Sequence, residues 1–405
     1  MIAVAEIEAA RSRIAGTARL TPLVPCERAC DLCGMPVYLK LENLQYTGAF
    51  KIRGAANCIA QMVETARDSG VVTASAGNHS QGVAAAARAF GIQAHIYMPR
   101  TTPFLKVERT RYFGGEVHLH GDNFDEAYQE ARRVQEEQGL AFVHPFADER
   151  VIAGQGTIGL ELLEQLPEVE SVVIPVGGGG LASGIASALR ARKQGMTIIG
   201  VQTVNAPAMA DSFATGDLCT VPVKPTIAEG IAVGSADDMT CHLLRELLDD
   251  IVVVEEGAIA SAMLDFIEDD NLVVEGAGAV GLAALPQIAE RLHGPTVLIV
   301  SGGNVDVTTM GAVIDRGLAV AERSVRLLVV LPDIPGALAR LAGVLGDAGA
   351  NIIEILHNRL TGEVQVGRAE VELVLLTRGP EHVEEVLRRL HDAGYEARKH
   401  AHAPS

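Results

Sequence analysis

The 405-residue sequence contains no tryptophan, only six cysteines, and few aromatic side chains, which make up 4% of the chain. This cysteine usage fits a reducing compartment. A chain of this length buries enough apolar surface to fold without disulfide or metal crosslinks. We therefore expect a globular protein of roughly two to three domains.

Positive charge is also scarce: the chain has 33 Lys and Arg residues but 51 Asp and Glu residues, which gives a formal net charge of −18. This balance argues against nucleic-acid and anionic-membrane partners. The N-terminus lacks the basic and apolar regions of a secretory leader. The uncharged stretch 171–189 approaches the length of a membrane span, but it contains Pro175 and four consecutive glycines. We expect a cytoplasmic protein.

A metal site is not predicted. Cys26, Cys30 and Cys33 have a spacing that resembles half of a zinc site, but no second pair of ligands follows them. We interpret them as ordinary thiols.

Glycine, in contrast, is abundant, with 42 residues against an average near 7%. Apolar runs without alternation are separated by Ala-rich helical patterns, which predicts an α/β protein with parallel sheets covered on both faces. Glycines cluster after Ser75, Val176 and Ser301, at predicted carboxyl ends of strands, where such sheets bind ligands. The predicted strands cover residues 36–42, 70–75, 94–99, 116–120, 171–176, 197–202, 250–255 and 296–301.

The pattern changes near residue 320. Residues 325–400 predict the order strand, helix, strand, strand, helix, strand, which is typical of a small α+β module. Residues 316–324 are the expected linker.

The segment Gly177–Leu181 follows a predicted strand and opens a predicted helix. Its exposed backbone N–H groups favour a phosphate. Two alternatives remain: a tight turn without ligand, and a dinucleotide fingerprint ending at Ala182. The second alternative lacks the expected acidic residue after the next strand, which ends in Val201-Gln202.

Three further segments carry candidate groups. Lys51 lies between a turn and a helix, where a lysine is usually a solvated charge but can also condense with a carbonyl cofactor. The stretch 75–82 offers hydroxyl, amide and backbone donors at a helix start, which suit a carboxylate or serve only as a cap. Ser301 precedes two glycines that allow a ligand to approach closely.

In this order, the segments resemble the fold-type II pyridoxal-phosphate enzymes, and within them the threonine dehydratase (threonine ammonia-lyase) group. The matching motifs are FKIRGA, SAGNHSQGVA, GQGTIGLEL, GGGGLASG, TIAEGIAV, VEGAGAVGLAAL and SGGN. The C-terminal motif VLPDIPGALARLAGVLGDAGANI resembles an ACT domain, an amino-acid-sensing module. The resemblance implies a catalytic domain over 1–320, built on two open parallel-rich sheets. The smaller subdomain, about 45–150, is inserted in the larger one, and an ACT-like regulatory domain covers 325–400.

The resemblance also implies the roles of individual residues. Lys51 would anchor pyridoxal 5′-phosphate covalently and act as the catalytic base, the glycines would hold its phosphate, Asn78 its 3′-oxygen and Ser301 its pyridine nitrogen. The implied cofactor site consists of Phe50, Lys51, Asn78, Gly177, Gly178, Gly179, Gly180, Leu181, Glu275 and Ser301. The implied substrate-carboxylate site consists of Ser75, Ala76, Gly77, Asn78 and His79.

The implied reaction converts L-threonine to 2-oxobutanoate and ammonia, with L-serine as a side substrate. Serine or 3-hydroxyaspartate dehydration, and a non-catalytic sensor, remain alternatives. Isoleucine or valine is the implied effector, in a dimer or tetramer, with Asp333, Gly336, Ala337, Leu338 and Asn351 as the implied effector site. A module that only dimerises and binds no effector remains an alternative.

Three positions depart from related enzymes. Ala49 and Ala76 stand where a serine is found in relatives. The second change predicts poor racemisation, because serine racemases use that hydroxyl. Glu229 replaces an aspartate that helps racemases bind a cation, but the partner position is Pro225, so no metal is predicted there.

Overall fold

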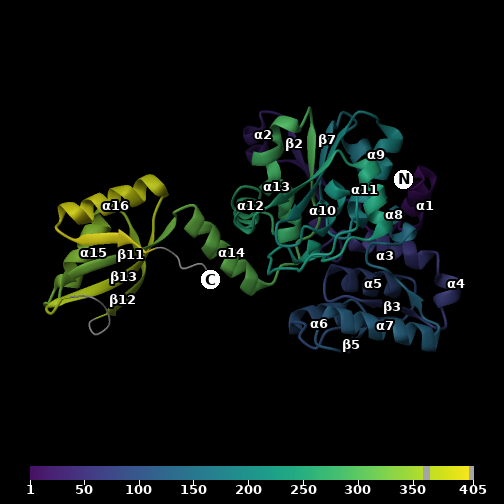
Figure 1. The fold of residues 1–405 in the computed structure, drawn as a ribbon, viewed down its shortest axis with the longest axis horizontal. Coiled ribbons are helices and arrows are strands. Elements are labelled where there is room, and N and C mark those ends of the chain that lie inside the picture. The colour runs from purple at the N-terminus through teal and green to yellow at the C-terminus, as the bar shows by residue number, and fades with distance from the viewer. Residues whose placement is uncertain (359–364, 401–405) are drawn as a thin grey trace. The chain divides into compact units, whose positions relative to one another are not determined.

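The computed structural model describes residues 1–358 and 365–400, and its chain divides into two units, Met1–Asp306 and Val307 onward (Figure 1). The eight strands expected from apolar runs all form. Two further strands, β1 and β6, are three and two residues long, too short to leave a hydrophobic pattern. No helix of the described residues has the length and apolarity that crossing a bilayer requires.

A six-stranded sheet forms the larger layer of the first unit, and its strands are parallel except for the β1–β2 pair. All residues of β7 and β10 are buried, as expected for a sheet covered on both faces. In spatial order its strands are β1 (Leu23–Pro25), β2 (Val37–Leu41), β10 (Thr296–Val300), β7 (Ser171–Pro175), β8 (Thr197–Thr203) and β9 (Asp250–Val254).

A second, four-stranded sheet is parallel throughout. The chain enters it after β2 and returns to the first sheet at β7. Helix α5 (Asn78–Ala89) packs against β3, β4 and β5, α6 (Phe104–Tyr112) packs against β5, and α7 (Phe124–Gln138) packs against β3 and β4. Its strands are β5 (Gly115–Leu119), β4 (Ala94–Met98), β3 (Val71–Ala74) and β6 (Ala141–Phe142).

The helices of the first unit connect these strands and cover the sheets. Short 3₁₀ helices are η1 (Glu42–Leu44), η2 (Glu229–Ile231) and η3 (Ala289–Arg291). The α-helices are α1 (Val4–Arg13), α2 (Glu27–Cys33), α3 (Lys51–Ala60), α4 (Val63–Ala66), α5 (Asn78–Ala89), α6 (Phe104–Tyr112), α7 (Phe124–Gln138), α8 (Glu149–Gln165), α9 (Gly180–Arg192), α10 (Ala208–Thr215), α11 (Asp238–Leu247), α12 (Glu256–Glu268) and α13 (Gly276–Ile288).

The second unit has the predicted α+β order and an antiparallel sheet. Alternate residues of β13 are buried, because one face of the sheet packs on α15 and α16. The expected linker at 316–324 is helical in its first part, since α14 continues to Val320 and packs against β11. The elements are α14 (Val307–Val320), β11 (Ser324–Pro332), α15 (Ala337–Asp347), β12 (Asn351–Asn358), β13 (Arg368–Leu376), α16 (Pro380–Asp392) and β14 (Glu396–Lys399).

Candidate active site

The residues that follow β3, β7 and β10 line one cavity of about 750 Å³ in the first unit. Parallel strands end at the same edge of a sheet, which explains why segments distant in sequence meet there. Of the stretch 75–79, all of which the structure describes, Ala76 alone does not line the cavity. The predicted residues that line it are Phe50, Lys51, Ser75, Gly77, Asn78, His79, Gly177, Gly178, Gly179, Gly180, Leu181, Glu275 and Ser301.

Lys51 is the first residue of α3, and its amine points into this cavity. Its Nζ donates a hydrogen bond to the carbonyl oxygen of Pro145, 2.8 Å away. Burial lowers the pKa of Lys51 to about 8, while the Glu275 carboxylate acts in the opposite direction. The amine is therefore much closer to its uncharged, nucleophilic form at neutral pH than an exposed lysine.

The glycine loop between β7 and α9 packs against protein atoms that leave no room for side chains. A Cβ on Gly178 would lie 2.5 Å from the ring of Phe146, and one on Gly177 would lie 2.9 Å from Cα of Ile231. Gly179 has φ +88°, in the left-handed region that favours glycine. The loop thus presents backbone rather than side chains at the start of the 13-residue helix α9.

Asn78 and Glu275, which line the cavity, belong to a hydrogen-bonded chain of two amides and a carboxylate. Asn78 Nδ2 donates to Glu275 Oε1 at 2.7 Å, and Asn304 Nδ2 donates to Asn78 Oδ1 at 2.8 Å. Burial raises the pKa of Glu275, and the hydrogen bond from Asn78 opposes that rise. Asn304 is the last residue of the SGGN motif, and the sequence predicted no role for it. In the structure its hydrogen bond fixes the orientation of the Asn78 side chain.

The Ser75 turn and His79 differ in what they offer a ligand. Ser75 Oγ accepts a hydrogen bond from the backbone N–H of Gly77, at the start of α5. His79 is 3% exposed, and its Nε2 lies 3.0 Å from the carbonyl oxygen of Val143. Burial and the nearby Lys51 lower the pKa of His79 to about 3, so the ring is neutral and Nε2 carries the proton that it donates.

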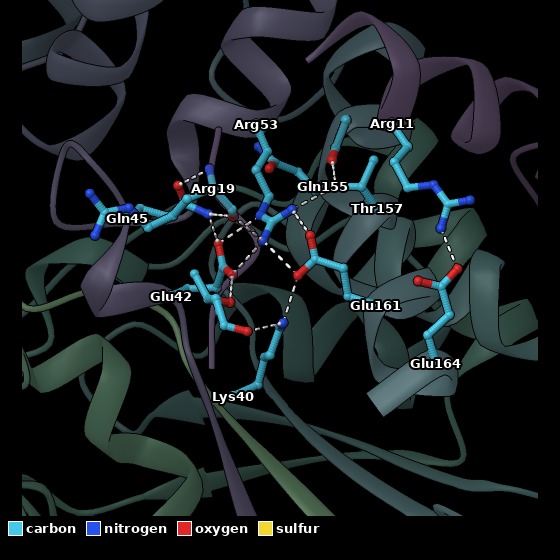
Figure 2. A network of polar contacts seen from close by, with 12 residues as sticks. Arg11, Arg19, Lys40, Glu42, Gln45, Arg53, Gln155, Thr157, Glu161 and Glu164 are labelled. Atoms are coloured by element: carbon cyan, nitrogen blue, oxygen red, sulfur yellow. Dashed lines mark hydrogen bonds and ion pairs between the residues drawn. The ribbon is translucent and has the colours of Figure 1, made fainter. Parts of the chain in front are cut away.

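Arg53, two residues after Lys51, anchors the first turn of α3 in a buried ionic network (Figure 2). Its guanidinium, 1% exposed, makes two hydrogen bonds of 2.8 Å to the Glu42 carboxylate and bonds of 2.6 and 2.9 Å to Glu161. Lys40 donates to Glu161 at 2.6 Å. Two cations thus pair with two anions, and the network joins β2, η1, α3 and α8.

An ion pair between Lys106 and Glu229 links α6 with η2 at the cavity margin. Lys106 was not predicted from the sequence, and neither were the cavity residues Phe124, Pro145 and Phe146. These residues lie in segments without a recognisable motif, and only the fold brings them together.

The three clustered cysteines have ordinary packing roles. Cys26 is buried, and Cys30 Sγ accepts a hydrogen bond from the backbone N–H of Val37 at 3.1 Å. Among the described residues, no group with metal-binding geometry includes Cys26, Cys30 or Cys33.

The proposed effector residues belong to the second unit. Gly336, with φ +82°, precedes α15, whose first residue Ala337 is buried while Leu338 is half-buried. Asp333 and Asn351 are exposed, and Asn351 is the first residue of β12.

Comparison with known proteins identifies the family. Residues 14–303 match the family of pyridoxal-phosphate dependent enzymes, and residues 325–394 match the ACT domain. The chain belongs to the pyridoxal-phosphate dependent enzymes. Pyridoxal phosphate is therefore its cofactor, and the C-terminal module is an ACT domain.

Relatives of this pyridoxal-phosphate dependent enzyme are similar over most of its length. The L-threonine ammonia-lyase of Thermotoga maritima is 46% identical over 98% of this chain and 99% of its own. The processed form of threonine deaminase isoform 2 from Solanum lycopersicum has a TM-score of 0.73 and 36% identity, covering 77% of this chain and 86% of its own. Maize serine racemase has a TM-score of 0.73 and 37% identity, and the match covers 79% of this chain and 98% of the racemase.

The cavity fits the requirements of this cofactor. A desolvated lysine amine is available for a carbonyl group, and side-chain-free backbone at a helix N-terminus is available for a phosphate. An anionic cofactor is compatible with the net charge of −18, because backbone dipoles rather than cations supply the attraction.

Proposed function

We propose that this enzyme is an L-threonine ammonia-lyase that converts L-threonine to 2-oxobutanoate and ammonia. The observation that carries the proposal is the Lys51 amine, desolvated in a cavity that also contains the helix start of α5. The similarity to the Thermotoga maritima L-threonine ammonia-lyase over nearly the whole chain supports threonine as the substrate.

We propose that the glycine loop 177–181 holds the cofactor phosphate, Asn78 its 3′-oxygen and Ser301 its pyridine nitrogen, with Phe50 and Glu275 beside them. When bound, the cofactor supplies an electron sink for the charge left by removal of the α-proton. Lys51 Nζ takes that proton as general base. The Ser75 hydroxyl and the backbone donors of Gly77, Asn78 and His79 hold the substrate carboxylate.

The decisive assay measures ammonia and 2-oxoacid released by the holoenzyme from L-threonine, L-serine and 3-hydroxyaspartate. Threonine is expected to be turned over with the highest kcat/KM. A higher value for serine or 3-hydroxyaspartate would assign the enzyme to that substrate. Absence of any 2-oxoacid would identify the chain as a non-catalytic amino-acid sensor.

Racemisation of serine is the second candidate, because maize serine racemase is 37% identical to this chain. Ala76 argues against it, since a racemase needs a proton-transferring group on the opposite face of the substrate. Interconversion of L- and D-serine is expected to be much slower than dehydration. Ala76→Ser tests this directly, since restoring the hydroxyl should raise the ratio of racemisation to dehydration.

We propose that the ACT domain binds isoleucine or valine at the turn Asp333–Leu338, with Asn351 as a further contact. The N-terminus of the 11-residue helix α15 suits the effector carboxylate. Titration of either amino acid should change threonine turnover in the full-length oligomeric enzyme, which we expect to be a dimer or tetramer. Asn351→Ala should weaken this response, while Asn358→Ala, at the other end of β12, should preserve it.

A further inference from the structure

A second cluster of chemically active side chains lies in the four-stranded sheet, away from the cavity. His95 is on β4, and Glu116 and His118 are on the neighbouring edge strand β5. The parallel register pairs His95 with Glu116, and His118 lies two residues further along β5, so all three point from the same face. This arrangement comes from strand pairing, which explains why no sequence motif indicated it.

The three side chains converge on one point. His95 Nδ1 and His118 Nε2 are 3.2 Å apart. Each nitrogen faces its own oxygen of the Glu116 carboxylate: Oε2 lies 3.6 Å from His95 Nδ1, and Oε1 lies 3.4 Å from His118 Nε2. A tetrahedral zinc ion with ligand bonds of about 2.0–2.1 Å requires ligand atoms separated by roughly 3.4 Å. The observed separations match that requirement.

Neighbouring groups hold the cluster in place. The ring of Tyr97 stacks on His118 with centroids 4.8 Å apart, and Gln93 Nε2 donates a hydrogen bond to Glu116. The side chains of His95, His118 and Glu116 are 16%, 32% and 48% exposed. An ion can therefore reach the cluster from solvent and keep a water as its fourth ligand.

We propose that His95, Glu116 and His118 bind a zinc-class divalent cation, which fastens the edge strand β5 to β4. Two imidazoles and one carboxylate form a ligand set that suits Zn²⁺ and the related ions Co²⁺ and Ni²⁺. None of the three residues lines the cavity: they lie on β4 and the edge strand β5, whereas Ser75 and Asn78 follow β3. The ion therefore stabilises the sheet and takes no part in the chemistry at Lys51.

The first test is titration of the dialysed holoenzyme with ZnCl₂ in phosphate-free buffer, followed by calorimetry. One ion per chain is expected, with a rise of a few degrees in Tm. Glu116→Gln and His118→Gln should each weaken binding at least about tenfold while leaving threonine turnover without added zinc unchanged. His391→Gln removes an exposed histidine that faces a single carboxylate, Asp392, and should leave zinc affinity unchanged.

Cobalt substitution provides a spectroscopic readout of which atoms bind the ion. Co²⁺ held by nitrogen and oxygen ligands in this geometry should give visible ligand-field bands, which His118→Gln should abolish. A cobalt–sulfur charge-transfer band would place the ion on a cysteine and overturn the proposal. Equal zinc affinity in the wild type and Glu116→Gln would overturn it as well, and would leave the His95–His118 contact as a simple hydrogen bond.

Discussion

Lys51 and Arg53 are two residues apart on the same helix, and the protein treats their charges in opposite ways. The guanidinium of Arg53 is buried against two carboxylates, which raise its pKa above the already high ordinary value. The amine of Lys51 faces a cavity and forms no ion pair with any carboxylate in the described part of the chain, so burial lowers its pKa to about 8. A buried cation thus stays charged when carboxylates neutralise it, and its pKa falls when they do not.

The largest effect is expected from Lys51→Ala. Turnover should fall by at least about 10²–10⁴-fold, because the general base is lost. The visible absorbance of the bound cofactor should disappear. Circular dichroism and Tm of the apoprotein should stay close to those of the wild-type apoprotein, since the hydrogen bond of the amine goes to a backbone carbonyl, that of Pro145, rather than to a buried carboxylate. Retention of both the absorbance and turnover would remove Lys51 from its proposed role.

Arg53→Met, unlike Lys51→Ala, should lower the stability of the fold. Removing the guanidinium leaves Glu42 and Glu161 buried without their main partner, which should cost about 3–5 kcal/mol of unfolding free energy. Chemical denaturation at pH 7 measures this loss, and Arg53→Lys should recover part of it by restoring the charge without the two-pronged geometry. A loss below about 1 kcal/mol would show that the network is not critical for the fold.

A smaller effect concerns the titration of Lys51 in the apoprotein. Labelling by an amine-selective reagent should rise with pH around a midpoint near 8, well below the ordinary lysine value of about 10.4. Between these two values the unfolded chain holds a proton that the folded chain has lost, so stability should increase with pH across that range.

Glu275→Gln tests the cause of this midpoint. The Glu275 carboxylate favours the charged amine, so its removal should move the labelling midpoint of Lys51 further down. Exposed Lys224 serves as an internal comparison in the same labelling experiment. An upward shift in the variant would contradict the assigned electrostatics.

The smallest effect is expected from Arg11→Gln. Arg11 forms an ion pair with Glu164 beside the buried network (Figure 2), but the two side chains are 46% and 62% exposed. Water screens such pairs, so the loss should be at most about 1 kcal/mol. A loss as large as that of Arg53→Met would show that burial is not what distinguishes the two arginines.

Much of this architecture could be predicted because its signals are local. Apolar runs predicted eight strands, and the change of pattern near residue 320 indicated a second domain. The shortest strands, β1 and β6, carry too few residues for such a signal. The prediction of a linker over 316–324 was wrong in its first part, because the amphipathic helix α14 continues to Val320.

The candidate site was predictable only where residues belong to motifs. Lys51, Asn78 and Ser301 stand in such motifs, and the fold brings them to one cavity. Phe146 and Lys106 could not be anticipated, since their positions depend on how loops return to the cavity.

By itself, the sequence determined the order of strands and helices, the abundance of glycine at strand ends and the candidate lysine, because these depend on spacing along the chain. The tertiary structure decided which buried charges have a partner of opposite charge. It also gave a second reason for the glycines at 177 and 178, where Ile231 and Phe146 occupy the space a side chain would need. Whether a buried charge is reactive or structural depends on neighbours such as Glu161, more than a hundred residues away along the chain, and only folding brings them into contact.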